Sequence, residues 1–259
     1  ALEELAGDLV IGRKIVTALS LLPRLSWRQV PEGHDDRDIS SWKFRRRLSF
    51  LRRPLLQFTD DTDPQMLCAP GPVREGFSSM VGNYYHGTYA DRHLGPVMRR
   101  YAGHARRRDG HEFNASVSAK VGRLGWKTHS EIPLTKVLAR RLDRNYGDVD
   151  VLAWDVDSRR VLVMECKDLQ FRKTYGEIAE QLMDFAGEVD KDGKRDLLRK
   201  HLDRVELLRA HATVVAQFLC LGDECLIESH LVFKNPVPME FAKGPITQCM
   251  QHTFDDLDS

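Results

Sequence analysis

The chain of 259 residues is 42% hydrophobic and 30% charged, with a formal net charge of +1. Such a composition is ordinary for a globular protein with one large core or two smaller ones, and it excludes a low-complexity chain. No apolar run approaches the roughly 20 residues that cross a bilayer, so no membrane partner is expected. The five cysteines show no paired spacing. This argues against a disulfide framework or a zinc site and indicates reduced thiols in the cytoplasm.

The N-terminal part of the chain predicts a helical, basic region over residues 1–70. Its segment "DLVIGRKIVTALSLLPRLSW" has the pattern of an amphipathic helix, and the chain starts at Ala1 in the middle of an apparent helix, so we expect a processed terminus or a fragment of a longer protein. Pro70 and Pro72 mark a boundary. Residues 71–110 mix aromatic and basic side chains and are expected to form connecting helices. The sequence leaves open whether residues 1–70 form a domain or only part of one.

The sequence contains two blocks rich in basic residues, which the near-zero net charge does not reveal. The block "KFRRRLSFLRR" carries six basic residues and no acid, and "RRYAGHARRR" repeats the bias. A solvated helix face explains either block alone as well as a surface for a polyanion does. Together with the aromatic residues between them, the blocks favour phosphate contacts and base stacking with a nucleic acid. The candidate nucleic-acid-binding residues here are Arg45, Arg46, Arg47, Arg106, Arg107 and Arg108.

The rest of the chain, residues 111–259, predicts one mixed α/β domain. Helical spacing in "HEFNASVSAKVGRLGW" is followed by a strand in "WKTHSEIPL". The segments "DVDVLAW" and "RVLVMECK" form a hairpin around the turn "DVDSRR". Two helices follow in "TYGEIAEQLMDFAGEV" and "KRDLLRKHLDRVELLRAH", and two further strands are expected in "ATVVAQFLCL" and "CLIESHLVF".

The two apolar strands of the hairpin contain acidic residues, which are unfavourable in a buried strand. Because side chains alternate along a strand, Glu165 and Lys167 share a face, and Asp150 on the preceding strand can converge with them. Two carboxylates that close favour a hard divalent cation between them, Mg²⁺ or Mn²⁺. Asp148 has the same parity and is the alternative ligand, but Asp150 lies nearer the apolar run. A surface hairpin with ion pairs in solvent is the other explanation of the pattern.

Asp150, a turn, and then Glu165-Cys166-Lys167 at the end of the next strand resemble the PD-(D/E)XK nuclease superfamily, especially its Mrr-like and RecB-like branches. The resemblance covers residues 110–233. It implies the restriction-endonuclease-like fold, which is a mixed sheet flanked by helices with an αβββαβ core. It also implies that Asp150 and Glu165 bind the metal and that Lys167 acts in catalysis.

The resemblance implies two further site residues. Glu112, near the start of the helix before the first strand, corresponds to an auxiliary metal ligand. Gln181, in the helix after the lysine, corresponds to a catalytic glutamine, although Phe185 replaces the tyrosine of that pattern. On the next, basic helix, Lys200 and Arg204 are candidates for phosphate contacts, and a solvated helix face is the alternative.

Together these residues predict a divalent-metal-dependent nuclease, an endonuclease or exonuclease that hydrolyses phosphodiester bonds, with DNA as the expected substrate. Defence, restriction and repair all suit the resemblance. The alternatives are a catalytically silent nucleic-acid-binding or assembly module of the same fold, and an RNA-directed nuclease. A homo-oligomer or a larger defence or repair complex is compatible with the sequence.

Overall fold

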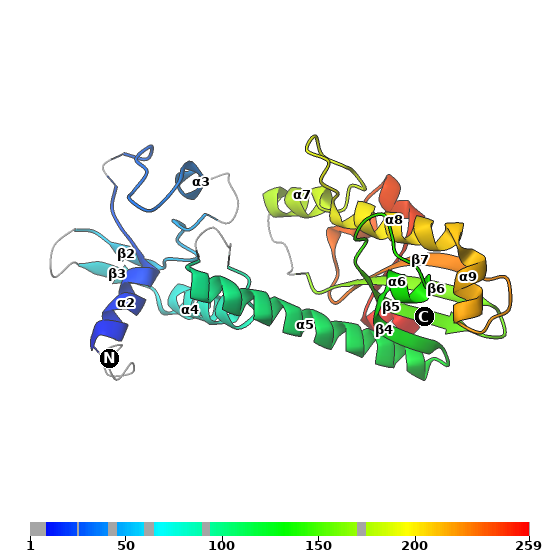
Figure 1. Ribbon diagram of the computed structural model, residues 1–259. Helices are drawn as coiled ribbons and strands as arrows, with labels where there is room; N and C mark the ends of the chain where they lie inside the picture. Colours follow the sequence, from blue (N-terminus) through cyan, green and yellow to red (C-terminus); the bar gives the residue numbers. More distant parts are fainter. Residues whose placement is uncertain are drawn as a thin grey trace. The chain divides into compact units, whose positions relative to one another are not determined.

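A computed structural model describes residues 9–24, 26–40, 46–59, 65–89, 94–169 and 175–258. The chain divides into two compact units, Ala1–Arg106 and Arg107–Ser259 (Figure 1). The first unit contains the expected N-terminal region and most of the expected connecting segment, and the second contains the expected mixed α/β domain. Within the described ranges, no helix combines the length and the apolar composition needed to cross a membrane.

The first unit combines helices with a small sheet. Its elements are α2 (Leu9–Leu19), β1 (Ser20–Leu21), α3 (Asp36–Ile39), β2 (Leu55–Gln57), β3 (Met66–Cys68), α4 (Pro70–Tyr85) and the first part of α5 (Pro96–Arg123). β1 pairs with β2 in parallel, and β2 pairs with β3 antiparallel. The predicted helical character of this region is confirmed. The sheet is absent from the prediction because strands of two or three residues are too short to show a period of two.

Close backbone packing holds α4 against the start of α5. Gly87, just after α4, has a φ of +63°, and a Cβ atom there would lie 2.5 Å from the carbonyl oxygen of Ala102. Glycine is therefore required both by the left-handed conformation and by the close approach. Tyr84 and Tyr101 stack beside this contact between the same two helices, with ring centroids 4.7 Å apart.

The second unit is a five-stranded sheet with helices on both faces. Its elements after α5 are β4 (Lys127–Pro133), α6 (Leu134–Val137), β5 (Asp148–Asp155), β6 (Arg160–Lys167), α7 (Tyr175–Met183), α8 (Leu197–Ala210), α9 (Ala212–Phe218), β7 (Leu226–Phe233), η2 (Pro238–Phe241), η3 (Pro245–Gln248), β8 (Met250–Thr253) and η4 (Asp255–Asp258). The strand order is β4-β5-β6-β7-β8. The β4–β5 and β5–β6 pairs are antiparallel, and the β6–β7 and β7–β8 pairs are parallel. The predicted mixed α/β class, with its order of helix, three strands, helices and strand, is confirmed.

Two apolar layers hold helices on opposite faces of this sheet (Figure 1). Val151 and Met164 pack with Phe113 and other residues of α5 on one face. Leu152 and Val163 pack with α8 and α9 on the other face. Because both faces are covered, a charged side chain within β5 or β6 needs a partner of opposite charge.

One predicted strand is wrong. Most of the segment "ATVVAQFLCL" forms the helix α9, which a single residue, His211, separates from the end of α8. Val215 and Ala216 of α9 are fully buried in the layer that also contains α8. Tertiary packing thus overrides the β-branched composition that predicted a strand. The short strand β8 is absent from the prediction because its sequence "MQHT" has no clear apolar alternation.

Candidate active site

The β5–β6 hairpin sets the two acidic positions opposite each other. Val151 pairs with Met164 and Leu152 pairs with Val163. The same register, continued by one residue, places Asp150 opposite Glu165. Directly opposed residues of an antiparallel pair share a face. Both carboxylates therefore lie on the side of the sheet that α8 covers.

Lys167 joins the two carboxylates. Its Nζ atom lies 2.6 Å from Oε1 of Glu165 and 3.4 Å from Oδ2 of Asp150. The backbone N–H of Cys166 also donates to Oδ2 of Asp150, at 2.9 Å. The Glu165 side chain is 7% exposed, whereas those of Asp150 and Lys167 are 20% and 24% exposed. The structure thus brings the three residues together in a site that is buried around Glu165 and reaches solvent through the other two.

Arg204 of α8 is the fourth charged member of this site. Its NH2 group donates to Oε2 of Glu165, and its NH1 group donates to the backbone oxygen of Asp148 at 2.6 Å. Arg204 is only 7% exposed. The alternative that Arg204 lies on a solvated helix face is therefore wrong, because a buried carboxylate requires a cationic partner and takes this one. Its contact with a phosphate stays a prediction.

A sequence signal for Arg204 exists in the pattern of α8. The buried residues Leu198, Val205 and Leu208 form one stripe of this helix, and His201 and Arg204 fall on or beside the same stripe. Charged residues that adjoin a buried stripe are candidates for internal ion pairs. The composition of "RKHLDR" conceals this, because it indicates a uniformly basic surface.

A series of buried polar groups continues behind Glu165. Nδ1 of His201 lies 3.9 Å from Oε2 of Glu165, and Nε2 of the same ring lies 3.0 Å from Oγ of Ser229. The Ser229 hydroxyl donates to Sγ of Cys249 at 2.9 Å. These contacts connect α8, β7 and the residue before β8 behind the carboxylate. They fix the position of His201 and, through it, the turn of α8 that carries Arg204.

The two carboxylates differ in acidity. Burial raises the pKa of Asp150, and the negative charge of Glu165 raises it further. For Glu165, burial acts in the same direction, but the charges of Lys167 and Arg204 outweigh it and lower the pKa to about 2. Burial lowers the pKa of Lys167, but the negative charges of Glu165 and Asp150 outweigh it, so the pKa of Lys167 is raised. Burial lowers the pKa of His201 to about 4, despite the nearby Glu165.

The structure does not bring Glu112 to the other carboxylates. Glu112 is exposed on α5, the helix that covers the opposite face of the sheet. No hydrogen bond or ion pair links its carboxylate to another described residue. A different acid contacts α5: Oε1 of Glu131 accepts from Nδ2 of Asn114 at 3.0 Å and contacts Nδ1 of His111. Glu131 has a φ of +53°, a conformation uncommon for a residue with a Cβ atom.

Gln181 of α7 is buried but does not join the group by a hydrogen bond. It is 3% exposed, and neither its amide nitrogen nor its amide oxygen has a partner among the described residues. Leaving a buried amide without partners costs roughly 1–3 kcal/mol. The Nε atom of Arg204 is likewise buried without a partner in the described part of the chain.

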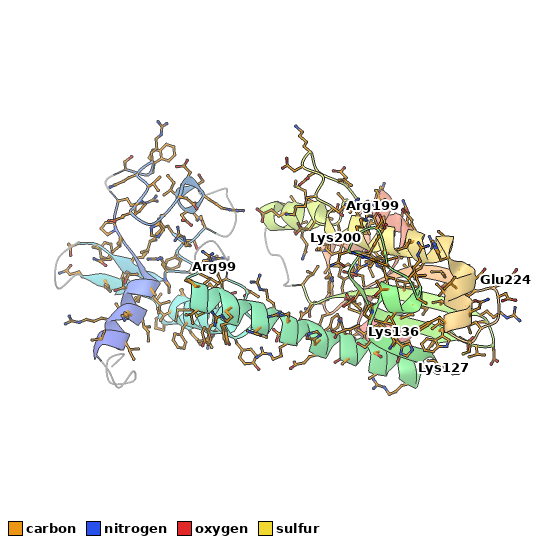
Figure 2. The ribbon with its side chains drawn as sticks, viewed as in Figure 1. Arg99, Lys127, Lys136, Arg199, Lys200 and Glu224 are labelled. Atoms are coloured by element: carbon orange, nitrogen blue, oxygen red, sulfur yellow. The ribbon has the colours of Figure 1, made fainter. Side chains whose placement is uncertain are left out.

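The predicted nucleic-acid-binding residues belong to several elements of both units. Arg45 lies outside the described residues. Arg47 donates through Nε and NH2 to the buried Asp38, at 2.9 and 2.5 Å, so its guanidinium holds part of the first unit together. Arg46 is partly buried. Lys200 is exposed on α8, one turn before Arg204 (Figure 2).

The other predicted arginines lie along α5. Arg106 and Arg107 are exposed, and Arg108 is partly buried. The Nε atom of Arg106 donates to the backbone oxygen of Ala102 at 3.2 Å, and NH2 of Arg108 lies 2.8 Å from Oδ1 of Asp109. These contacts orient two of the three guanidinium groups along the helix.

The donor set of the site suits a hard divalent cation. Asp150 and Glu165 offer carboxylate oxygens on one face. Burial, and then the negative charge of Glu165, raise the pKa of Asp150, and a bound cation would act in the opposite direction. Among the described residues, no three His, Cys, Asp or Glu side chains form a metal-binding group. Mg²⁺ commonly uses only one or two carboxylates together with water and substrate phosphate oxygens, so two carboxylates are sufficient for it.

The fold and the site define a mixed α/β protein whose sheet carries two carboxylates bridged by a lysine and backed by an arginine. The description "Anti-phage protein Upx-like" belongs to the family whose sequence pattern matches residues 3–255. The chain therefore belongs to the Upx-like family of anti-phage proteins, and this family supports a role in phage defence. No curated protein and no solved structure matches the chain.

Proposed function

We propose that this member of the Upx-like family is a divalent-metal-dependent nuclease that hydrolyses phosphodiester bonds in DNA. The observation that carries the proposal is the contact of a single ammonium group, that of Lys167, with both Asp150 and Glu165. Phosphodiester hydrolysis needs positive charge beside the phosphate and a positioned water molecule. Two carboxylates and a lysine provide for both. The resemblance of these residues to PD-(D/E)XK nucleases supports this chemistry, and phage defence supplies a nucleic-acid substrate.

Each residue has a separate task in this proposal. Asp150 and Glu165 would hold Mg²⁺ or Mn²⁺. When bound, the ion would neutralise charge on the phosphate and lower the pKa of a water molecule. Lys167 supplies a positive charge beside the reacting group. Arg204 fixes the Glu165 carboxylate from α8, and the N–H of Cys166 fixes that of Asp150, so both oxygens are positioned before a substrate arrives.

Two further residues fit contacts with the substrate. Lys200 is exposed one turn before Arg204, so it can contact a backbone phosphate without selecting a sequence. Gln181 has a buried amide whose polar atoms lack partners among the described residues. A ligand that supplies the missing hydrogen bonds would bind with a more favourable free energy.

Parallel digestion of duplex DNA, single-stranded DNA and RNA in Mg²⁺ tests the proposal. We expect the parent chain to cut DNA and Asp150→Asn to cut at least about 100-fold more slowly. Asp157→Asn is the matched control, because it makes the same chemical change in the exposed turn of the same hairpin. Cutting by Asp150→Asn at the parent rate would refute the site.

The other outcomes separate the remaining alternatives. If Asp148→Asn, and not Asp150→Asn, abolishes cutting, the ligand is Asp148. Cleavage of RNA with DNA left intact would identify an RNA-directed nuclease. Binding of nucleic acid without cleavage of any substrate would identify a silent binding or assembly module.

A further inference from the structure

The first unit contains a hollow lined by positive charge. Its volume is about 530 Å³, and it is lined by Val10, Arg13, Lys14, Thr17, Ala18 and Arg53. Five of these residues belong to α2, at spacings of three and one that place them on one face of the helix. None of the described residues that line it is acidic. The hollow therefore combines three cationic side chains, a hydroxyl group and a small apolar surface.

Strand pairing brings Arg53 to this helix face from a distant part of the sequence. Ser20 of β1, which directly follows α2, pairs with Leu55 of β2. Arg53 precedes β2 by two residues, and its NH1 group donates to the backbone oxygen of Ser20 at 3.1 Å. The backbone N–H of Arg53 donates to the oxygen of Ser49 at 2.8 Å. The guanidinium of Arg53 is thus held in place by the fold (Figure 1 shows α2 and β2).

The three cations form no ion pair in the described part of the chain, and the carboxylate of Asp38 acts on Arg53 only through longer-range charge. No ion pair joins Arg13, Lys14 or Arg53 to a described carboxylate. By contrast, Arg47 in the same unit contacts Asp38 at 2.5 Å. An anion that enters a hollow lined by three cationic side chains is attracted by all three of them.

We propose that this hollow binds phosphate groups of a nucleic-acid strand. The cations suit successive backbone phosphates, Thr17 can donate a hydrogen bond to a phosphate oxygen, and Val10 and Ala18 offer apolar surface to a sugar. A free nucleotide has the same phosphate chemistry and is the other source. The hollow belongs to the first unit, whereas Asp150, Glu165 and Lys167 belong to the second, and binding in the hollow does not depend on hydrolysis.

The test measures binding of a fluorescent single-stranded 15-mer to the chain of 259 residues by anisotropy, in EDTA, so that cleavage plays no part. We expect Arg13→Gln/Lys14→Gln to weaken binding on the order of tenfold and to lower the salt slope by about 1.4, since each lost single-strand contact removes about 0.7. Arg28→Gln/Arg74→Gln is the control. It removes two positive charges from exposed positions of the same unit, and it should change affinity less than about twofold.

Several outcomes decide the proposal. Equal weakening by both double variants would overturn it, because general charge would then explain binding. Binding to anionic phospholipid vesicles without binding to the 15-mer would also overturn it. A mononucleotide that binds more tightly than the 15-mer assigns the hollow to free nucleotides, and the reverse order assigns it to a strand. Arg53→Lys keeps the charge, and circular dichroism checks the fold of every variant.

Discussion

Each unit of the chain buries one carboxylate against an arginine, but the two pairs differ in their surroundings. Asp38 is fully buried, and Arg47 satisfies it through its backbone N–H and through Nε and NH2. Glu165 is almost as buried, but it is shared between Arg204 and Lys167, and a second carboxylate, Asp150, lies beside it and is 20% exposed. The first pair is balanced and closed. The second contains two carboxylates and two cations, and it reaches solvent through Asp150 and Lys167. This access to solvent distinguishes a candidate active site from a closed structural ion pair.

The largest expected effect is on catalysis at the shared carboxylate. Lys167→Met should reduce DNA cleavage at least about 100-fold, because the substrate loses the positive charge beside the phosphate. The control is Lys234→Met, which removes an ammonium group that contacts the partly exposed Asp168 at 2.6 Å. Rates in Mg²⁺ measure both variants. If the two variants lose activity equally, the site around Glu165 is no more than structural.

The next effect is on stability. Arg204→Met should lower the free energy of unfolding in urea by about 3 kcal/mol, because it leaves the buried Glu165 with Lys167 as its remaining ion-pair partner. The double variant Arg204→Met/Glu165→Gln should recover at least about 1 kcal/mol, since the uncompensated charge is then absent. Lys200→Met, one turn away and exposed, should change stability by less than about 0.5 kcal/mol. No recovery in the double variant would show that Arg204 acts through packing alone.

Some elements of the fold are predictable from the sequence and others are not. The β5–β6 hairpin is predictable because two apolar runs flank a polar turn, and its register then places Asp150 opposite Glu165. The helix α9 is not, because its β-branched residues favour a strand until α8 and the sheet are in place. The sheet β1–β2–β3 is not, because its strands are too short to give a pattern.

The same limit applies to the site. Asp150, Glu165 and Lys167 belong to one hairpin, so local alternation is enough to bring them together. Arg204 lies 39 residues from Glu165 in the sequence, and their contact depends on how α8 packs on the sheet. The prediction that Glu112 is a metal ligand also depends on which face of the sheet its helix covers. Its position in the resemblance suggests a ligand, whereas α5 lies on the other face.

The smallest expected effect concerns the closed pair. Burial acts to raise the pKa of Asp38, but hydrogen bonds and charge from Arg47 lower it from 3.8 to about 2. A lowered pKa stabilises the fold above pH 3.8, and this stabilisation is lost as the pH falls toward 2. We expect Asp38→Asn to remove about 1–2 kcal/mol of this dependence. Urea unfolding between these pH values measures it, with the exposed Asp36→Asn as control. An unchanged pH profile in Asp38→Asn would show that the pair contributes little.

The most direct test of the metal site is calorimetric titration of the chain of 259 residues with Mn²⁺. We expect Mn²⁺ to bind and to raise the melting temperature by mass action. Asp150→Asn should weaken Mn²⁺ binding more than about tenfold, because loss of a hydrogen bond that only supports a metal ligand already costs roughly that much. Asp157→Asn should bind Mn²⁺ as tightly as the parent does. Equal Mn²⁺ affinity in the parent and in Asp150→Asn would contradict a metal site at this hairpin.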